Sequence, residues 1–144
     1  MLPDRIERHP AGGYVLLRSL VLSTLNTYIQ DAMQYEAGGI LLGSYRGEHI
    51  EVVSASVPHP GDKRSRFGFT RNREGHQQLA ERAWIESGKT ITYVGEWHTH
   101  PESIPKPSVL DLESWARDLP KRDMVLLIQG IDDLFVGVHS PFIC

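Results

Sequence analysis

Two histidines separated by one residue, together with two carboxylates, could hold a metal ion and activate water. The histidines are His98 and His100, and the carboxylates are Glu36 and Asp111. Side chains two apart on an extended strand project from the same face, so both imidazoles can reach one ion. A catalytic zinc site needs three protein ligands and an open position for water, which makes Asp111 the natural third ligand. The spacing is therefore typical of a zinc hydrolase with one ion.

A proline-rich loop joins the second histidine to the segment that carries the aspartate. Residues 101–107 contain three prolines, which preset φ and remove backbone donors, so the chain is expected to turn here. Ser108 and Asp111 then open a helix and, three residues apart, face the same side. The same pair also fits a capping box, in which the two side chains would only satisfy the helix start. The sequence leaves both interpretations of Ser108 and Asp111 open.

Length, charge and cysteine content narrow the classes of protein. The 144 residues fit one domain over 1–144, large enough for a core without disulfides. A net charge of -3 argues against nucleic acid as a partner. The single cysteine, Cys144, gives no disulfide framework and favours a reducing, cytoplasmic location. No apolar run approaches the roughly 20 residues of a membrane span, and Met1–Arg5 is unlike a signal peptide, so no membrane association is expected.

Hydrophobic periodicity indicates the elements that must position these side chains. Apolar spacing and end signals predict helices over 19–35, from Thr70 or Asn72 to Ser87, and over 108–119. Strands are expected over 14–17, 37–45, 50–57, 90–97, 124–129 and 134–139. The stretch 58–69 is interpreted as a long solvated loop. Its basic residues are Lys63, Arg64 and Arg66, for which plain surface is favoured and a partner site is the alternative. Strand pairs alternating with helices predict a three-layer mixed α/β domain.

Two glutamates lie near the expected site. Glu36 precedes Gly38 and Gly39, which are expected to form a bend or to let two backbones approach closely. Glu96 lies two residues before His98 and shares its face, so it could contact a ligand side chain without binding the ion. The alternative is that Glu96 is simply a carboxylate on an edge strand. The remaining histidines lack a spacing partner and are expected to be surface or packing residues: His9, His49, His59, His76 and His139.

The order of these residues resembles the signature of the JAMM (MPN-plus) metalloproteases, in which a glutamate precedes H-x-H-P and S-x-x-D. Glu36, His98, His100, Ser108 and Asp111 match all five polar positions. The segment 36–43 also resembles the glutamate and following strand of that family. The resemblance covers nearly the whole chain and implies the JAMM/MPN fold, a three-layer mixed β-sheet flanked by helices of the cytidine-deaminase-like type.

The resemblance also implies an activity, namely a zinc peptidase that cuts peptide or isopeptide bonds after the C-terminal glycine of ubiquitin-like proteins. His98, His100 and Asp111 would then hold one Zn²⁺. Glu36 would act as the general base that takes a proton from the zinc-bound water. Ser108 would stabilise the tetrahedral oxyanion.

The segment GEWHTHPESIPKPS further resembles compact bacterial JAMM peptidases of anti-phage defence operons. Those operons also encode ubiquitin-activating-like and ubiquitin-conjugating-like enzymes, which are therefore expected partners. The implied role is to reverse the conjugation of an operon protein, such as a cyclic-oligonucleotide synthase or a ubiquitin-like modifier. Few residues follow Asp111, so the second insertion that gives some relatives linkage selectivity is not expected.

Other functions remain open at this level. A sulfur-carrier pathway would use the same chemistry to trim a small β-grasp protein, and MPN-type domains can also serve as non-catalytic scaffolds. Two histidines and a carboxylate also occur in iron oxygenases, although those usually order the ligands as H-x-D and a distant histidine on an all-β scaffold. A deaminase-type zinc site is excluded because it needs two cysteines.

Overall fold

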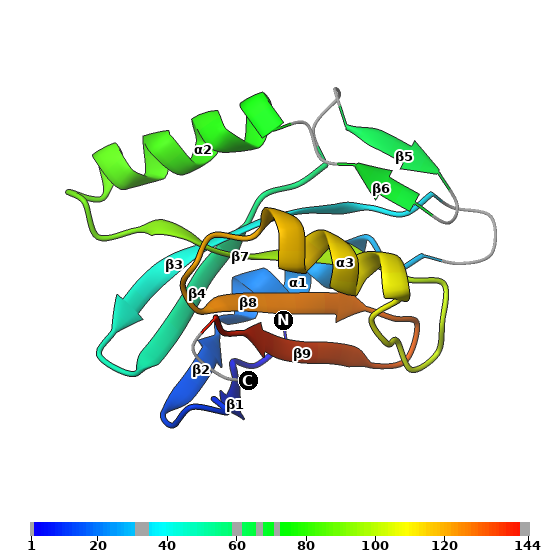
Figure 1. Cartoon of the computed structure of the whole chain (residues 1–144), viewed down its shortest axis with the longest axis horizontal. Coiled ribbons are helices and arrows are strands. Elements are labelled where there is room, and N and C mark those ends of the chain that lie inside the picture. The colour runs from blue at the N-terminus through cyan, green and yellow to red at the C-terminus, as the bar shows by residue number, and fades with distance from the viewer. Residues whose placement is uncertain (1, 31–34, 59–61, 66–67, 71–72, 142–144) are drawn as a thin grey trace.

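A seven-stranded mixed sheet forms the centre of the molecule, with helices on both of its faces (Figure 1). The computed structural model describes residues 2–30, 35–58, 62–65, 68–70 and 73–141. Within them the sheet order is β1-β2-β4-β3-β7-β8-β9, and a separate two-stranded sheet holds β5 and β6. The strands are β1 (Arg5–Arg8), β2 (Tyr14–Leu17), β3 (Gly38–Arg46), β4 (His49–Ala55), β5 (Lys63–Ser65), β6 (Gly68–Thr70), β7 (Thr92–Thr99), β8 (Met124–Gln129) and β9 (Leu134–His139). The expected mixed α/β class is confirmed.

Three helices surround the sheet in the described part of the chain. They are α1 (Ser19–Thr27), α2 (Arg73–Glu86) and α3 (Val109–Asp118). In Figure 1, α3 lies in front of the sheet and α1 behind it, while α2 lies along one margin. None of the described helices is long and apolar enough to cross a bilayer.

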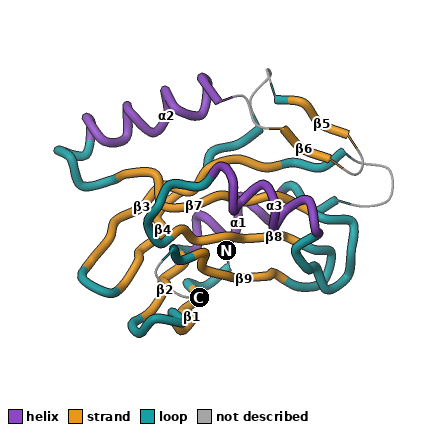
Figure 2. The backbone as a smooth tube through the Cα atoms, in the orientation of Figure 1, coloured by secondary structure: helices purple, strands orange, loops and turns teal. Residues whose placement is uncertain are grey.

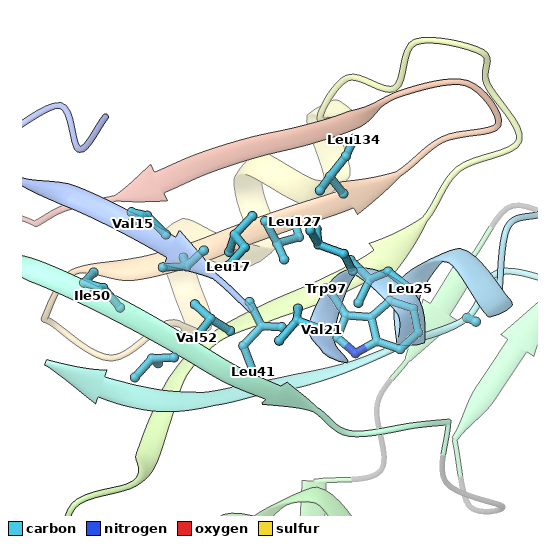
Figure 3. Close-up of a cluster of buried hydrophobic side chains, with 14 residues drawn as sticks. Val15, Leu17, Val21, Leu25, Leu41, Ile50, Val52, Trp97, Leu127 and Leu134 are labelled. Carbon is cyan, nitrogen blue, oxygen red and sulfur yellow. The ribbon is translucent and has the colours of Figure 1, made fainter. Parts of the chain in front are cut away.

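The main core lies between α1 and the sheet (Figure 3). Val21 and Leu25 of α1 meet side chains from five strands, and all of them are fully or almost fully buried: Val15, Leu17, Leu41, Ile50, Val52, Trp97 and Leu127. Burial of a large aliphatic side chain contributes about 1.5–3 kcal/mol. A smaller cluster on the opposite face packs Trp115 of α3 on Leu126 and Ile128 of β8. The sheet is thereby packed on both of its faces.

β7 is an interior strand of the sheet, and the candidate ligand His98 lies near its C-terminal end, between β3 and β8. It pairs antiparallel with β3, with Gly38 opposite His98, and parallel with β8, with Ile128 opposite His98. A Cβ atom on Gly39 would lie 2.5 Å from the backbone oxygen of Ser56, so the close backbone approach expected near Glu36 is present. The start of β3 therefore lies beside the end of β7.

Several expected boundaries were wrong. The first helix ends at Thr27 rather than near residue 35, because Tyr28 leaves the helical conformation and packs on Trp97. Residues 31–34 lie outside the described residues. Strand β1 was not expected, because charged side chains on an edge strand hide its alternation.

The segment 58–69 is also not a plain loop. It contains β5 and all but the last residue of β6, and the two strands pair antiparallel near the start of α2 (Figure 2). Lys63 and Arg64 belong to β5, whereas Arg66 lies outside the described residues. Strands of three residues carry too short a pattern to be recognised among glycine and proline signals.

Candidate metal centre and active site

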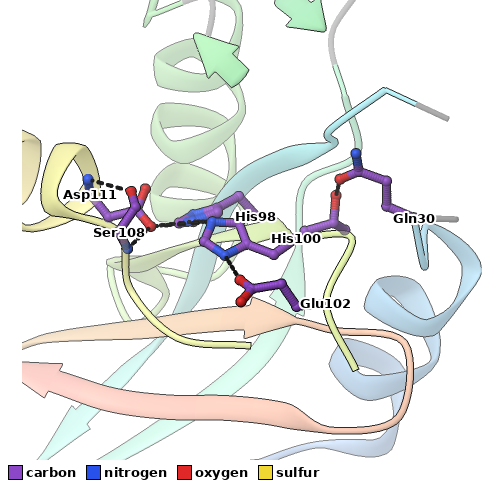
Figure 4. A network of polar contacts seen from close by, with 7 residues as sticks. Gln30, His98, His100, Glu102, Ser108 and Asp111 are labelled. Atoms are coloured by element: carbon purple, nitrogen blue, oxygen red, sulfur yellow. Dashed lines mark hydrogen bonds and ion pairs between the residues drawn. The ribbon is translucent and has the colours of Figure 1, made fainter. Parts of the chain in front are cut away.

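Three side-chain atoms converge at the end of β7 (Figure 4). His98 Nε2 lies 3.2 Å from His100 Nε2, and Asp111 Oδ2 lies 3.3 Å from the first and 3.2 Å from the second. Zinc bonds of about 2.0–2.2 Å in a tetrahedral site place neighbouring ligand atoms about 3.3–3.5 Å apart. The nearly equilateral triangle therefore has the dimensions of three ligands around one ion, and the residues present fit a metal.

The two histidines reach this point because of strand alternation. His98 lies in β7 and His100 directly follows it, so both rings project from one face while Thr99 points to the other. The ring of His98 also packs on Trp115 of α3, with centroids 6.1 Å apart. Both histidines are buried, with 9% and 8% of their surface exposed.

Asp111 is aimed by the cap of α3. Ser108 Oγ accepts a hydrogen bond from Asp111 N at 3.0 Å, and Ser108 N donates to Asp111 Oδ2 at 2.8 Å, which completes a capping box. The same Oδ2 faces both imidazoles. The two interpretations of Ser108 and Asp111 therefore hold together, because the helix cap is what points the carboxylate at the histidines.

Glu102 is a residue that the sequence analysis did not single out. Its Oε1 lies 2.9 Å from His100 Nδ1, and its side chain is half exposed. A carboxylate on Nδ1 holds the proton there and leaves the Nε2 lone pair for an ion, an arrangement common among metal-binding histidines. The available signal was a carboxylate two residues after a candidate ligand.

Glu36 lies beside the triangle, with only 6% of its surface exposed. Glu36, His98 and His100 each offer a ligand atom within 4.8 Å of the others. Burial raises the pKa of the Glu36 carboxyl, and the nearby charge of Asp111 raises it further, while the charges of His98 and His100 oppose them in part. A carboxyl with a raised pKa holds and releases protons closer to neutral pH than an ordinary glutamate.

The charges of Asp111 and His100 stabilise each other. Burial alone would raise the pKa of Asp111, but the hydrogen bonds from His100 and His98 outweigh it and bring that pKa well below its usual range. Burial likewise works to lower the pKa of His100, but the hydrogen bond and charge of Asp111, followed by the bond to Glu102, outweigh it and raise that pKa. Asp111 therefore stays ionised, the form in which a carboxylate can bind a metal ion.

Glu96 is not on an edge strand, because β7 lies between β3 and β8. Its Oε1 accepts a hydrogen bond from Tyr93 Oη at 2.8 Å. The edge-strand interpretation was therefore wrong, and a supporting role for Glu96 behind the ligands stays a prediction.

The other described histidines make local contacts. His9 is buried and pairs with Asp123, His76 is buried between Ser56 and Asp62, and exposed His49 accepts from Tyr14 N. His139 is half-buried in β9, and His59 lies outside the described residues.

The sheet, the capped helix and the two-histidine cluster together are those of a bacterial JAMM-type hydrolase. The chain belongs to the family described as Prokaryotic homologs of the JAB domain, which it matches over residues 20–138. The resemblance seen in the sequence is thereby confirmed at the level of the family.

Individual relatives agree with this family. The chain is 38% identical to a CD-NTase/cGAS isopeptidase of Escherichia coli over 127 residues, which is 87% of this chain and 81% of the relative. It is 42% identical to a protein of the same name from Pseudomonas aeruginosa over 122 residues, 79% and 77% of the two chains. A probable metalloprotease of Sinorhizobium fredii is 29% identical over 120 residues, 75% and 73%.

A solved structure supports the fold alone. The solution structure of a Desulfitobacterium hafniense protein superposes with a TM-score of 0.63 at 21% identity and covers 85% of this chain and 86% of its own.

Proposed function

We propose that this protein is a zinc-dependent isopeptidase that releases a protein joined through its C-terminus to an amine, as in ubiquitin-like conjugation. The observation that carries the proposal is the triangle of His98 Nε2, His100 Nε2 and Asp111 Oδ2 with a buried carboxyl, Glu36, beside it. The relatives are named CD-NTase/cGAS isopeptidases, and on that basis we propose that the conjugated protein is a CD-NTase. The role would be to reverse conjugation in a bacterial anti-phage system.

The pKa values distinguish the roles of the two carboxylates. Asp111 has a lowered pKa and stays charged, which suits the third ligand beside His98 and His100. Glu36 has a raised pKa, which suits a group that accepts a proton and returns it. When bound, the ion would acidify a water molecule and polarise the scissile carbonyl. Glu36 would take the proton of that water and deliver it to the departing amine.

Ser108 would contribute through its hydroxyl hydrogen. In the cap of α3 its Oγ serves as an acceptor for Asp111 N, so the O–H is left to donate. A donor at this position would stabilise the negative charge that develops on the carbonyl oxygen. We expect ubiquitin-activating-like and ubiquitin-conjugating-like enzymes of the same cytoplasm to make the conjugates.

The test uses the zinc-loaded protein and a CD-NTase whose C-terminal tail is linked through an isopeptide bond to a lysine peptide. The wild-type protein should cleave the conjugate and lose activity with a chelator. Glu36→Gln should retain one zinc per chain and lose cleavage by at least about 100-fold, the lower range for a general base. Full cleavage by Glu36→Gln would overturn the assignment of the base.

One further substrate separates the alternatives. A β-grasp sulfur carrier with a short extension after its terminal glycines tests the processing function. If zinc-loaded wild-type protein cleaves neither the conjugate nor the extended carrier, the non-catalytic scaffold is favoured.

Cys144→Ser should cleave like the wild type, because a metal-dependent mechanism uses no thiol.

A further inference from the structure

Thr99 lies between the two histidine ligands but points away from them, into the interior. It is fully buried, as alternation along a strand requires for a residue whose neighbours face the site. Its Oγ1 accepts a hydrogen bond from Ala37 N at 2.9 Å, and its backbone N donates to Ala37 O, also at 2.9 Å. Both backbone polar groups of Ala37 are therefore held by a single residue of β7.

This matters because Ala37 adjoins Glu36. The β3–β7 ladder starts with Gly38 opposite His98, so Ala37 and Glu36 lie just before it. The Thr99 hydroxyl extends the pairing by one further hydrogen bond. It thus ties the backbone that carries Glu36 to the residue between His98 and His100.

Gln30 completes the link. It is fully buried, follows the end of α1, and its Oε1 lies 3.1 Å from Thr99 Oγ1. The Thr99 hydroxyl has one hydrogen to donate; since a lone pair takes the Ala37 N–H, that hydrogen goes to Gln30 Oε1. The two partners of the Thr99 hydroxyl, Ala37 and Gln30, lie 62 and 69 residues away from Thr99 in sequence. In Figure 4, Gln30 lies on the side of His100 opposite Asp111.

We propose that Thr99 and Gln30 are positioning residues that hold Glu36 in register with the histidine ligands. The proposal rests on the proposed function in one respect only, that Glu36 moves the proton. Reacting groups must be held to within about 0.5 Å of productive geometry. A valine at position 99 would fill the same space but leave Ala37 N and Gln30 Oε1 without this partner in the interior.

The kinetic test compares Thr99→Val with Thr99→Ser, which keeps the hydroxyl, and with Thr92→Val, the same substitution at the other end of β7. For Thr99→Val we expect kcat to fall about 10–100-fold, the usual range for groups that orient a metal site, with KM and zinc content unchanged. Thr99→Ser should restore kcat to within a few fold of the wild type, and Thr92→Val should leave it unchanged. Equal impairment of the serine and valine variants would show that the methyl packing matters instead, and wild-type rates in Thr99→Val would overturn the proposal.

Gln30→Met provides a second route, because it removes the acceptor without touching β7. If Thr99→Val does not fold, the same fall in kcat at constant KM is expected for Gln30→Met. Wild-type kcat in that variant would contradict the role of Gln30.

A measurement without substrate separates this proposal from the proposed function. Hydrogen exchange of the Ala37 amide should be slow in the wild type and in Thr99→Ser, and at least tenfold faster in Thr99→Val. If no conjugate is cleaved but this pattern is seen, the tether exists and the proposed function fails. If Ala37 exchange is the same in all three proteins, the tether itself is refuted, whatever the activity.

Discussion

Two buried clusters of histidine and aspartate lie on either side of the start of β3, and they are arranged in different ways. At the end of β7, two ring nitrogens and one carboxylate oxygen converge to within 3.2–3.3 Å of one another. Around His76, each ring nitrogen has its own partner: Nδ1 lies 2.9 Å from Ser56 Oγ, and Nε2 lies 3.0 and 3.1 Å from the two oxygens of Asp62.

Convergence, rather than composition or burial, separates the candidate metal site from the cluster around His76. His76 is even more deeply buried than His98, and it also has an aspartate partner. Ser56, His76 and Asp62 are the residue types of a nucleophilic triad, yet Ser56 is buried and its Oγ also accepts from Ile40 N at 2.8 Å. We therefore interpret the His76 cluster as a link that joins Asp62 and the first part of α2 to β3 through Ser56.

The largest expected effect breaks this comparison with one substitution in each cluster. Asp111→Asn removes the charge of the proposed third ligand, so we expect zinc affinity to fall by at least about 100-fold, the upper range for changes around a metal site, and cleavage to be lost. Asp62→Asn should retain one zinc per chain. The zinc content of the two variants, measured by atomic absorption after gel filtration, checks both expectations. Loss of zinc from Asp62→Asn would mean that the two clusters are not independent.

The second expected effect concerns stability. His76→Leu leaves Ser56 and Asp62 without their shared partner in the interior, so the free energy of unfolding should fall by about 3 kcal/mol. Exposed His49, which accepts one backbone hydrogen bond, is the control, and His49→Leu should cost less than about 1 kcal/mol. Urea unfolding of the zinc-loaded proteins measures both. A loss below 1 kcal/mol for His76→Leu would show that this cluster is not a structural link.

Ser108 tests the third effect, because one residue serves a cap and a proposed oxyanion contact. Ser108→Asn keeps the cap, since asparagine is a strong N-cap residue, but it removes the hydroxyl. We expect unfolding free energy close to that of the wild type and kcat lowered about 100-fold, as for the loss of one oxyanion donor. Ser108→Ala should show the same lowered kcat as Ser108→Asn, and its free energy of unfolding should also fall by about 1 kcal/mol. A wild-type kcat in Ser108→Asn would show that Ser108 only caps α3 and makes no oxyanion contact.

The sequence alone predicted those parts of the site that depend on local periodicity. His98 and His100 face one side because alternation along a strand is geometric, and Asp111 follows from the capping pattern of α3. The positions of Glu102 and Thr99 could not be predicted in the same way. Their roles depend on which ring nitrogen or backbone group lies within 3 Å, which is set by tertiary packing.

The errors in the fold have a related cause. The apolar spacing beyond Thr27 is helical in pattern, but Tyr28 packs against Trp97, so a tertiary contact outweighs local preference. β1 escaped notice because Arg5 and Glu7 pair with each other on an exposed edge. In both cases the pattern was interpreted without knowing which neighbour the segment would meet.

Glu102 tests the smallest effect and sharpens the comparison, because it contacts a histidine ring nitrogen as Asp62 does but from a half-exposed position. Its carboxylate competes with water for His100 Nδ1, so Glu102→Ala should lower zinc affinity by only about tenfold, the lower end for a group that orients a ligand. Glu102→Gln, which keeps an acceptor oxygen, should bind zinc more tightly than Glu102→Ala. Competition with a chromogenic chelator measures all three affinities. If Glu102→Ala loses zinc as completely as Asp111→Asn, then Glu102 acts on the ion itself rather than through His100.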